Sequence, residues 1–374
     1  MDPTVGEPGE PELLPLVLPG LYFGSLGVCF VAIFTNWGPF KAPRLDLDLA
    51  LIAIASAGVA LRVTWGLIFA FFREHLQGYC CDGSSLTSLF TCRSPQWLAA
   101  SGGDTFLEAY VQVTDDAGGW VWSSMLLMWV VPGCLWLHVE ATRLGFSRGR
   151  QLAFLVVGFL GAISVAFPLF FADVLARHRH RLGMKDGVAS AEVSLGLTAV
   201  APLVAALVCA FVLPHTVHRA PVVYTVALAS LHFVLMIPSL FNGRAPTADN
   251  RAHARLALVY AAIAGATALQ HGQNLTIYLT QSEVTPDFRQ LLAAGWDGHC
   301  QSSISWDAVF TSFACIAFMV ASRGWANALP FVVLSPFFTV AATFSAFLAS
   351  NELRLLLELR HQPTETKDPT RRPT

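Results

Sequence analysis

The sequence contains few charged residues and no surplus of positive charge. Asp, Glu, Lys and Arg make up 13% of the 374 residues, about half the share found in soluble globular domains. The 23 Lys+Arg and 25 Asp+Glu give a formal net charge of −2, which argues against binding to nucleic-acid phosphates. The chain is instead 54% hydrophobic, with a mean hydropathy of +0.55. This balance disfavours a water-soluble enzyme or a disordered protein and favours a polytopic membrane protein.

Sequence motifs for nucleotides and metals are also missing. The chain has no G-x-x-x-x-G-K-[ST], no G-x-G-x-x-G after a strand and no H-E-x-x-H. The HRH segment at 178–180 has no acidic partner nearby and is interpreted as a basic loop. Aspartate-rich clusters of the D-D-x-x-D kind, which hold Mg²⁺ on prenyl diphosphates, are absent as well. We therefore expect no metal and no cofactor.

Long apolar runs predict an all-α, polytopic transmembrane bundle. A helix needs about 20 apolar residues to cross the hydrocarbon layer. Nine runs approach that length, at 14–35, 49–72, 120–141, 152–175, 193–213, 221–241, 256–280, 303–322 and 329–350. The fifth run is weak because it is rich in Ala and Val, contains Pro202 and ends at Pro214. The expectation is therefore eight spans, within a range of eight to nine.

The two ends of the chain are polar and frame one transmembrane helical domain at 14–355. Residues 1–13 are acidic and Pro-rich and lack the basic n-region of a cleaved signal peptide. Residues 361–374 are polar without aromatics, which is typical of a disordered tail. We expect a multi-pass protein that resides in the endoplasmic reticulum, with the lipid bilayer as its main partner; nothing in the sequence indicates its oligomeric state.

Loop charges and cysteines indicate the orientation. The loops at 142–151 and 242–255 carry three Arg each, so the positive-inside rule predicts that both are cytoplasmic. The acid-rich loops at 73–119 and 281–301 are then lumenal. They contain four cysteines that could form disulfides or stay free thiols, Cys80, Cys81, Cys92 and Cys300. A further basic cluster at 177–181 does not fit strict alternation. We resolve this by expecting that the fifth run does not cross fully.

Parts of the sequence suggest an internal duplication. The third and eighth runs both open with a Ser-Ser pair and are followed about twenty residues later by Arg143-Leu144-Gly145 and Ser322-Arg323-Gly324. These similarities predict two four-helix units, at roughly 14–180 and 220–355. Chance resemblance between apolar helices is the alternative interpretation. In membrane proteins with repeats, the functional site commonly lies at the repeat interface near the midplane.

Two ionisable residues stand out inside apolar runs. An ionisable group at the centre of a span costs roughly 2.5–3.5 kcal/mol on insertion scales. Arg62 lies in the middle of the second run, so we expect it to face the bundle interior and pair there, either structurally or at a substrate. Asp307 follows Trp306 early in the eighth run. It is a candidate Brønsted acid, with a helix-start Asp near the interface as the alternative.

The seventh run carries four polar residues in succession, Gln270, His271, Gln273 and Asn274. Gln270, Gln273 and Asn274 share one helical face, which indicates either a lined cavity or interhelical hydrogen bonds. Glu140 near the end of the third run is a second acid candidate, although a structural role is the simpler interpretation.

These features fit one reaction class. Protonation of an alkene or epoxide starts a carbocation cascade, for which a buried acid supplies the proton. Aromatic faces stabilise the cation while a dry pocket excludes water. The runs are rich in candidate wall residues, including Trp65 and Trp306.

The layout resembles the membrane-bound terpene cyclases of fungal meroterpenoid pathways, of the ascochlorin and ascofuranone type. The resemblance lies in the length, the eight or so helices, the large acid- and Cys-containing loop and the helix Gln301-Ser302-Ser303-Ile304-Ser305-Trp306-Asp307. It implies an isomerase-type enzyme of secondary metabolism. This enzyme would cyclise a lipophilic prenylated aromatic by opening its terminal epoxide with acid, without metal. Asp307 would be the acid and Arg62 would tune or anchor it. The side chains of His271, Gln273 and Asn274 would line the pocket or hold the polar aromatic head.

Two other classes stay open. A small-solute transporter or channel would also show a repeat with midspan polar residues, but the runs lack obvious broken helices and a chain of acids. A non-catalytic membrane scaffold would leave Arg62 and Asp307 as structural residues.

Overall fold

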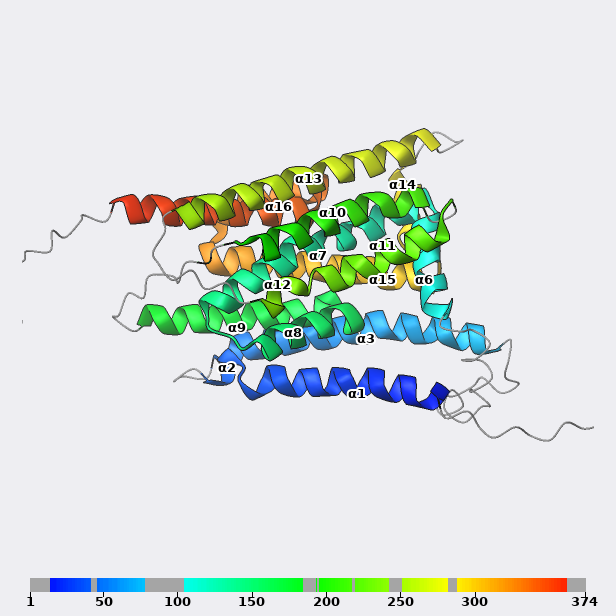
Figure 1. Cartoon of the computed structure of the whole chain (residues 1–374), viewed down its shortest axis with the longest axis horizontal. Helices are drawn as coiled ribbons and strands as arrows, with labels where there is room; N and C mark the ends of the chain where they lie inside the picture. Colours follow the sequence, from blue (N-terminus) through cyan, green and yellow to red (C-terminus); the bar gives the residue numbers. More distant parts are fainter. Residues whose placement is uncertain are drawn as a thin grey trace, which may run out of the picture.

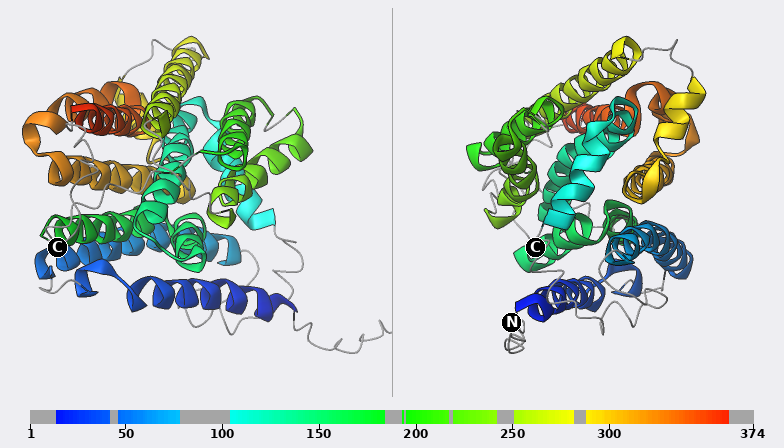
Figure 2. Two further views of the ribbon diagram at one scale, coloured as in Figure 1. Left: turned by 60° about the vertical axis from the view of Figure 1, so that its left-hand side comes forward. Right: turned by 90° about the vertical axis from the view of Figure 1, so that its right-hand side faces the viewer.

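The computed structural model describes residues 14–41, 46–77, 104–183, 193, 195–216, 219–241, 251–281 and 288–361, and within them the architecture is all-α with no β-strand. The predicted fold class is therefore confirmed. The helices lie roughly side by side, with α1 and α13 at opposite sides of the bundle (Figures 1 and 2). Their bounds are α1 Leu14–Thr35, α2 Gly38–Lys41, α3 Leu47–Gln77, α6 Asp104–Asp115, α7 Ala117–Arg143, α8 Arg148–Val156, the π-helical turn η1 Val157–Gly161, α9 Ile163–Gly183, α10 Leu197–Thr216, α11 Pro221–Val234, α12 Ile237–Leu240, α13 Arg251–Gln281, α14 Phe288–Ala294, α15 Gly298–Arg323 and α16 Trp325–His361.

Eight segments in the described part of the chain are long and apolar enough to cross a membrane, which is the expected number, although one of them, Trp325–Glu358, turns back on itself as described below. The membership differs from the prediction. The fifth run, expected not to cross fully, forms α10 and has the highest mean hydropathy of the eight, 2.4. The fourth run gives no such segment. η1 and the extended Ala162 (φ −167°, ψ 145°) divide it into α8 and α9, and α9, although long enough, carries Asp173 and the basic cluster at 177–181.

The divided fourth run folds back on itself as a helical hairpin, which we call hairpin 1 (residues 148–183). The Phe154 and Phe170 rings lie 5.1 Å apart, and Arg150 pairs with Asp173, so α8 and α9 run antiparallel. Both ends of hairpin 1 therefore lie at the same end of the bundle. A helical segment that enters and returns is tolerated in a membrane where protein surrounds it.

Helix α16 is a second hairpin, hairpin 2 (residues 325–361). Its backbone leaves helical geometry at Thr339 (φ 67°, ψ 155°), four residues after Ser335. The Phe331 and Phe347 rings lie 5.5 Å apart, whereas sixteen residues of a straight helix would span about 24 Å. The Ser335 and Thr343 hydroxyls are hydrogen-bonded at 2.7 Å across the turn. The last apolar run therefore turns back near its middle.

The ends of the bundle differ in charge. At one end, called the basic end, Arg143 pairs with Glu352, His178 with Glu140, and Arg179 with Asp46. Hairpin 1 explains why the cluster at 177–181 lies at the same end as the loop at 142–151: the intervening run returns rather than crosses. The expected reason, a partial fifth run, was wrong. The positive-inside rule predicts that the basic end faces the cytoplasm.

The two halves of the chain share an order of elements. In each half a helix and a one-turn helix (α1–α2, α11–α12) precede a 31-residue helix, α3 or α13. A shorter helix (α6, α14), a long helix (α7, α15) and a hairpin follow, with Gly145 and Gly324 at positive φ before the hairpins. This shared order favours the predicted duplication, whose boundaries remain a prediction.

Of the four loop cysteines, Cys300 is a buried free thiol that packs with Phe71 and Val113. Cys80, Cys81 and Cys92 lie outside the described residues, as do the tails at 1–13 and 362–374.

Candidate functional site

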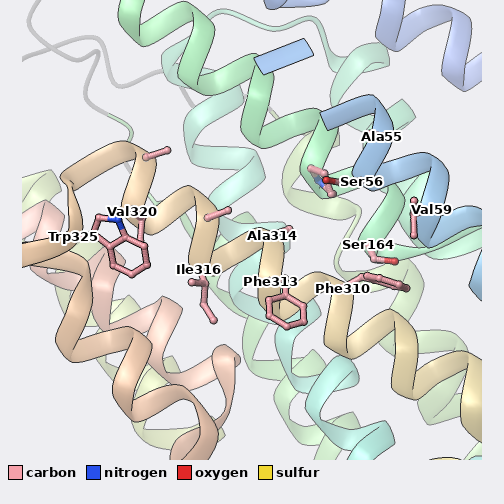
Figure 3. A pocket seen from close by; sticks show the side chains of 13 residues that line it. Ala55, Ser56, Val59, Ser164, Phe310, Phe313, Ala314, Ile316, Val320 and Trp325 are labelled. Atoms are coloured by element: carbon pink, nitrogen blue, oxygen red, sulfur yellow. The ribbon is translucent and has the colours of Figure 1, made fainter. Parts of the chain in front are cut away.

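An apolar groove lies between α3, α9 and α15 (Figure 3). Its volume is about 790 Å³. The α3 wall includes Ala55 and Val59, the α9 wall includes Ser164, and α15 contributes Phe310 and Phe313. Phe313 is 65% exposed, so the groove opens on the apolar surface of the bundle. A lipophilic molecule can therefore enter it from the bilayer without passing through water.

Asp307 lies behind Ser164, beside the groove but not among the residues that line it, and it caps the tip of hairpin 1. Its Oδ1 accepts a hydrogen bond from the Ser164 backbone N–H at 2.7 Å, and its Oδ2 accepts one from the Ile163 N–H at 3.2 Å. The first N–H groups of a helix have no partner within the helix, and a carboxylate there also meets the positive end of the helix dipole. Asp307 thus supplies, from α15, the N-terminal cap that α9 lacks.

Ser164 joins the groove to the acid. It is fully buried and lines the groove. Its hydroxyl lies beside the Asp307 carboxylate, yet it makes no hydrogen bond of proper geometry within the described part of the chain. An unpartnered buried hydroxyl can donate a hydrogen bond to a polar atom of a ligand or accept one from it. Sequence reasoning missed Ser164, although the glycine-rich segment just before it (Gly158, Gly161) is a signal of irregular backbone.

The tip of hairpin 1 has two further side-chain partners. The Trp65 Nε1–H donates to the Gly161 carbonyl at 2.7 Å, and the Tyr22 hydroxyl donates to the Leu160 carbonyl. Backbone groups released by a turn inside a membrane need such partners. Trp65, expected to bind substrate, therefore holds the hairpin tip, and it is not among the groove-lining residues.

Aromatic side chains extend from the groove along α15. Trp306 stacks on Phe310, with ring centroids 5.4 Å apart, and meets Trp296 edge-on at 5.9 Å. Trp296 in turn contacts Trp122 at 4.9 Å. Trp306, a predicted site residue, thus packs against the groove-lining Phe310 and does not itself line the groove.

Arg62 does not face the bundle interior, contrary to the expectation. Its side chain is exposed on α3, and no hydrogen bond or ion pair joins it to another described residue. Helical spacing puts it on the same face as Ala55 and Val59, one turn beyond the groove. The prediction was wrong because the flanking α3 sequence is apolar on both its lipid-facing and its packed faces, so hydropathy does not reveal which way Arg62 projects.

The polar segment of α13 makes interhelical bonds and does not line the groove. The Gln270 amide donates to the Ala210 carbonyl at 3.0 Å, and the Asn274 amide donates to the Ser124 hydroxyl at 2.9 Å. His271 is buried, whereas Gln273 is exposed. Gln270 and Asn274 therefore contact neighbouring helices, whereas Gln273 lies on the surface. Of the two interpretations drawn from the sequence, these contacts match interhelical hydrogen bonds rather than a lined cavity.

Glu140 belongs to a buried cluster at the basic end. It accepts from Arg143 at 2.8 Å and pairs with His178 at 3.1 Å. Asp307 lies at the hairpin tip, and the fifteen residues of α9 between Ile163 and His178 rise roughly 22 Å. The structure therefore does not bring the two acid candidates together.

The space between the two hairpins is filled by aromatic rings. Trp136 of α7 contacts Phe170 of hairpin 1 at 5.0 Å, Phe318 of α15 at 4.8 Å and Phe344 of hairpin 2 at 5.8 Å. Trp136 and Phe170 are therefore core residues.

No family model, curated protein or solved structure matches the chain.

Proposed function

We propose that this integral membrane protein is a terpene cyclase of the fungal meroterpenoid kind, acting on a prenylated aromatic with a terminal epoxide or alkene. One observation carries the proposal: a buried carboxyl group, Asp307, accepts a hydrogen bond from the Ser164 backbone, and Ser164 lines an apolar groove that contains Phe310 and Phe313 and opens on the apolar surface of the bundle. We expect the protein to reside in the endoplasmic reticulum, where such lipophilic substrates partition.

In the proposed reaction, protonated Asp307 gives its proton to the epoxide oxygen through the Ser164 hydroxyl, which receives one proton and passes on another. The C–O bond of the epoxide breaks as a chain alkene attacks the developing cation, and the former epoxide oxygen becomes a hydroxyl. Loss of a proton from the final cation returns Asp307 to its starting state. The product is an isomer of the substrate, and no oxidant or reductant is consumed.

Three groove residues have defined tasks in this reaction. Phe310 and Phe313 present ring faces to the chain, where they can stabilise passing cations. The apolar wall formed with Val59 keeps water from quenching them. Glu140 takes no part because it lies at the other end of hairpin 1.

The test uses microsomes that contain the protein and a farnesylated phenolic epoxide, with detection of an isomer of unchanged mass. Asn is itself a good N-cap, so Asp307→Asn keeps an acceptor for the α9 N-terminus while it removes the proton donor. We expect conversion to fall at least 100-fold in Asp307→Asn and to persist in the control Glu140→Gln, provided that both variants retain the wild-type thermal transition. A folded Asp307→Asn variant with undiminished conversion would refute the assignment.

A transporter is the second candidate, because re-entrant segments of this kind also occur in transporters. The aromatic packing around Trp136 argues against an aqueous path between the hairpins. Uptake of a labelled solute into proteoliposomes, without any isomerisation in microsomes, would favour the transporter.

A further inference from the structure

Helix α3 exposes a positive charge in the middle of its span. α3 lies at the periphery of the bundle (Figure 2), and its candidate membrane span runs from Leu47 to Glu74. The Arg62 side chain is exposed, and no hydrogen bond or ion pair joins it to another residue in the described part of the chain. A charged side chain near the centre of a span is costly, so such residues usually have a partner inside the membrane.

The Arg62 guanidinium lies well inside the hydrocarbon layer. Along α3, Arg62 is roughly 22 Å from Leu47 and roughly 18 Å from Glu74. A Cβ at Gly66 would lie 3.0 Å from the Arg62 Nη1, so the guanidinium rests against the helix about one turn closer to Glu74. About 12 Å of helix still separates Gly66 from Glu74. A lipid phosphate at the level of Glu74 therefore does not reach the guanidinium in an undistorted bilayer.

The surface around Arg62 allows another helix to approach closely. Gly58 and Gly66 lie four residues before and after Arg62, so they share one face of α3 with Arg62 and Leu51; we call these four residues the Arg62 face. A Cβ at Gly58 would meet no heavy atom within 4 Å, and Leu51 is 57% exposed. Glycines on an exposed membrane helix let the backbone of a second helix come near. None of the four residues lines the groove, so the Arg62 face is separate from the candidate site.

A second copy of this chain does not offer a charge that complements Arg62. In a two-fold dimer formed through the Arg62 face, the two Arg62 side chains would meet at equal depth and repel each other. The acidic residues within the described spans are either buried or close to the end of a span; they are Asp48, Glu74, Glu140, Asp307, Glu352 and Glu358. The described part of the chain therefore supplies no exposed carboxylate at the depth of Arg62.

We propose that the Arg62 face docks one transmembrane helix of a different membrane protein, which carries an Asp or Glu at the depth of Arg62. A helix is the structure that crosses the membrane as a single segment. The guanidinium can donate two parallel hydrogen bonds to a carboxylate, and the ion pair compensates both charges away from water. The docking surface does not depend on the enzymatic activity proposed above, because it contains no residue of the groove.

The experiment uses full-length protein in phosphatidylcholine vesicles and a synthetic Leu/Ala helix of about 24 residues with one Asp at its centre. Energy transfer between a donor dye on the protein and an acceptor dye on the peptide reports association. We expect the Asp peptide to bind at least 10-fold more tightly than matched peptides with Asn or Leu at the centre. Moving the Asp by seven residues toward either end should weaken binding at least fivefold, because the carboxylate then lies roughly 10 Å from the depth of Arg62.

Matched variants, each first shown to keep the wild-type thermal transition, assign the binding to the Arg62 face. Arg62→Leu should weaken binding of the Asp peptide at least 10-fold, to the level of the Leu peptide, and Arg62→Glu should transfer the preference to a peptide with a central Lys. Gly58→Leu should weaken binding at least fivefold by holding the two helices apart. Gly265→Leu on α13, at another exposed glycine with open space around it, should leave binding unchanged.

Other occupants of the Arg62 face would give different results, each of which overturns the proposal. Equal binding of the Asp and Leu peptides, or binding that is indifferent to Arg62→Leu, would show that the face does not recognise a carboxylate. Energy transfer between two labelled copies of the protein that is lost in Arg62→Leu would assign the face to self-association. Retention of spin-labelled phosphatidylglycerol that depends on Arg62, without any preference for the Asp peptide, would assign Arg62 to a lipid head group.

Discussion

The buried pair between Arg143 and Glu352 makes the sharpest prediction about stability, because it ties α7 to hairpin 2. Arg143 donates to both oxygens of Glu352, at 2.8 and 2.9 Å, and His253 of α13 bonds the same carboxylate at 2.7 Å. The Arg143 and Glu352 side chains are each 5% exposed. Glu352→Ala removes the carboxylate and leaves the buried Arg143 without this partner. Removing one member of a buried pair costs about 3–5 kcal/mol.

The same helix provides a matched control. Glu358 pairs with Arg354 at 2.6 Å, but these side chains are 52% and 55% exposed. Exposed pairs on a helix contribute well under 1 kcal/mol, so Glu358→Ala should change stability little. Both variants delete a glutamate of hairpin 2 and differ in whether its partner is buried.

The assay is thermal unfolding in detergent, followed with a thiol-reactive fluorophore that reports exposure of the buried Cys134 and Cys315. Each 1 kcal/mol corresponds to roughly 2–4 °C in Tm for chains of some 200 residues. We therefore expect Glu352→Ala to lower the apparent Tm by about 10 °C and Glu358→Ala by no more than about 2 °C. Equal shifts in the two variants would refute the reasoning that the Arg143 cluster holds the helices together.

Four further substitutions test the backbone and Arg62, each with the same thermal assay. Arg62→Leu should leave Tm unchanged or raise it slightly, because Arg62 is exposed within a span; a large drop would show that it has a partner. Gly38→Ala should destabilise by roughly 1–3 kcal/mol, since a Cβ there would meet the Asp173 carboxylate at 2.6 Å. Gly58→Ala, with open space around it, should instead stabilise α3 by up to about 1 kcal/mol. Thr339→Gly should stabilise by about 1 kcal/mol because a β-branched residue at φ 67° is strained; a loss of stability would show that the Thr339 side chain matters more than the strain.

Hydropathy predicts that a segment is in the membrane but does not predict its path. The run at 152–175 is as apolar as a crossing helix because a re-entrant hairpin surrounded by protein needs apolar side chains too. The basic cluster at 177–181 carried the missing information: its charge required the chain to return to the basic end. We expected the interruption in α10, where Pro202 favours a break, yet Pro202 is buried within a continuous helix.

The direction of a polar side chain was harder to predict than its depth. Arg62 and Asp307 were both expected to be inward-facing intramembrane charges, but only Asp307 is buried. Its partners are backbone N–H groups of hairpin 1, which no pattern of side chains could have indicated. The fully buried Ser164 and the exposed Trp325 were missed for the same reason. The groove is formed by helices far apart in the sequence, and each contributes residues that alone resemble lipid-facing or core positions.

A comparison of the two hairpin tips indicates why only one half of the molecule carries an acid. Asp307 lies seventeen residues before Gly324, and the position seventeen residues before Gly145 is Met128, which is fully buried. Hairpin 2 has a tip secured by its own Ser335 and Thr343 hydroxyls, so it needs no carboxylate from a neighbouring helix. If the two halves arose by duplication, a second buried carboxyl group that had no partner or function would have cost several kcal/mol of stability. This difference between the two tips favours the proposed one-site enzyme over a symmetric two-site carrier.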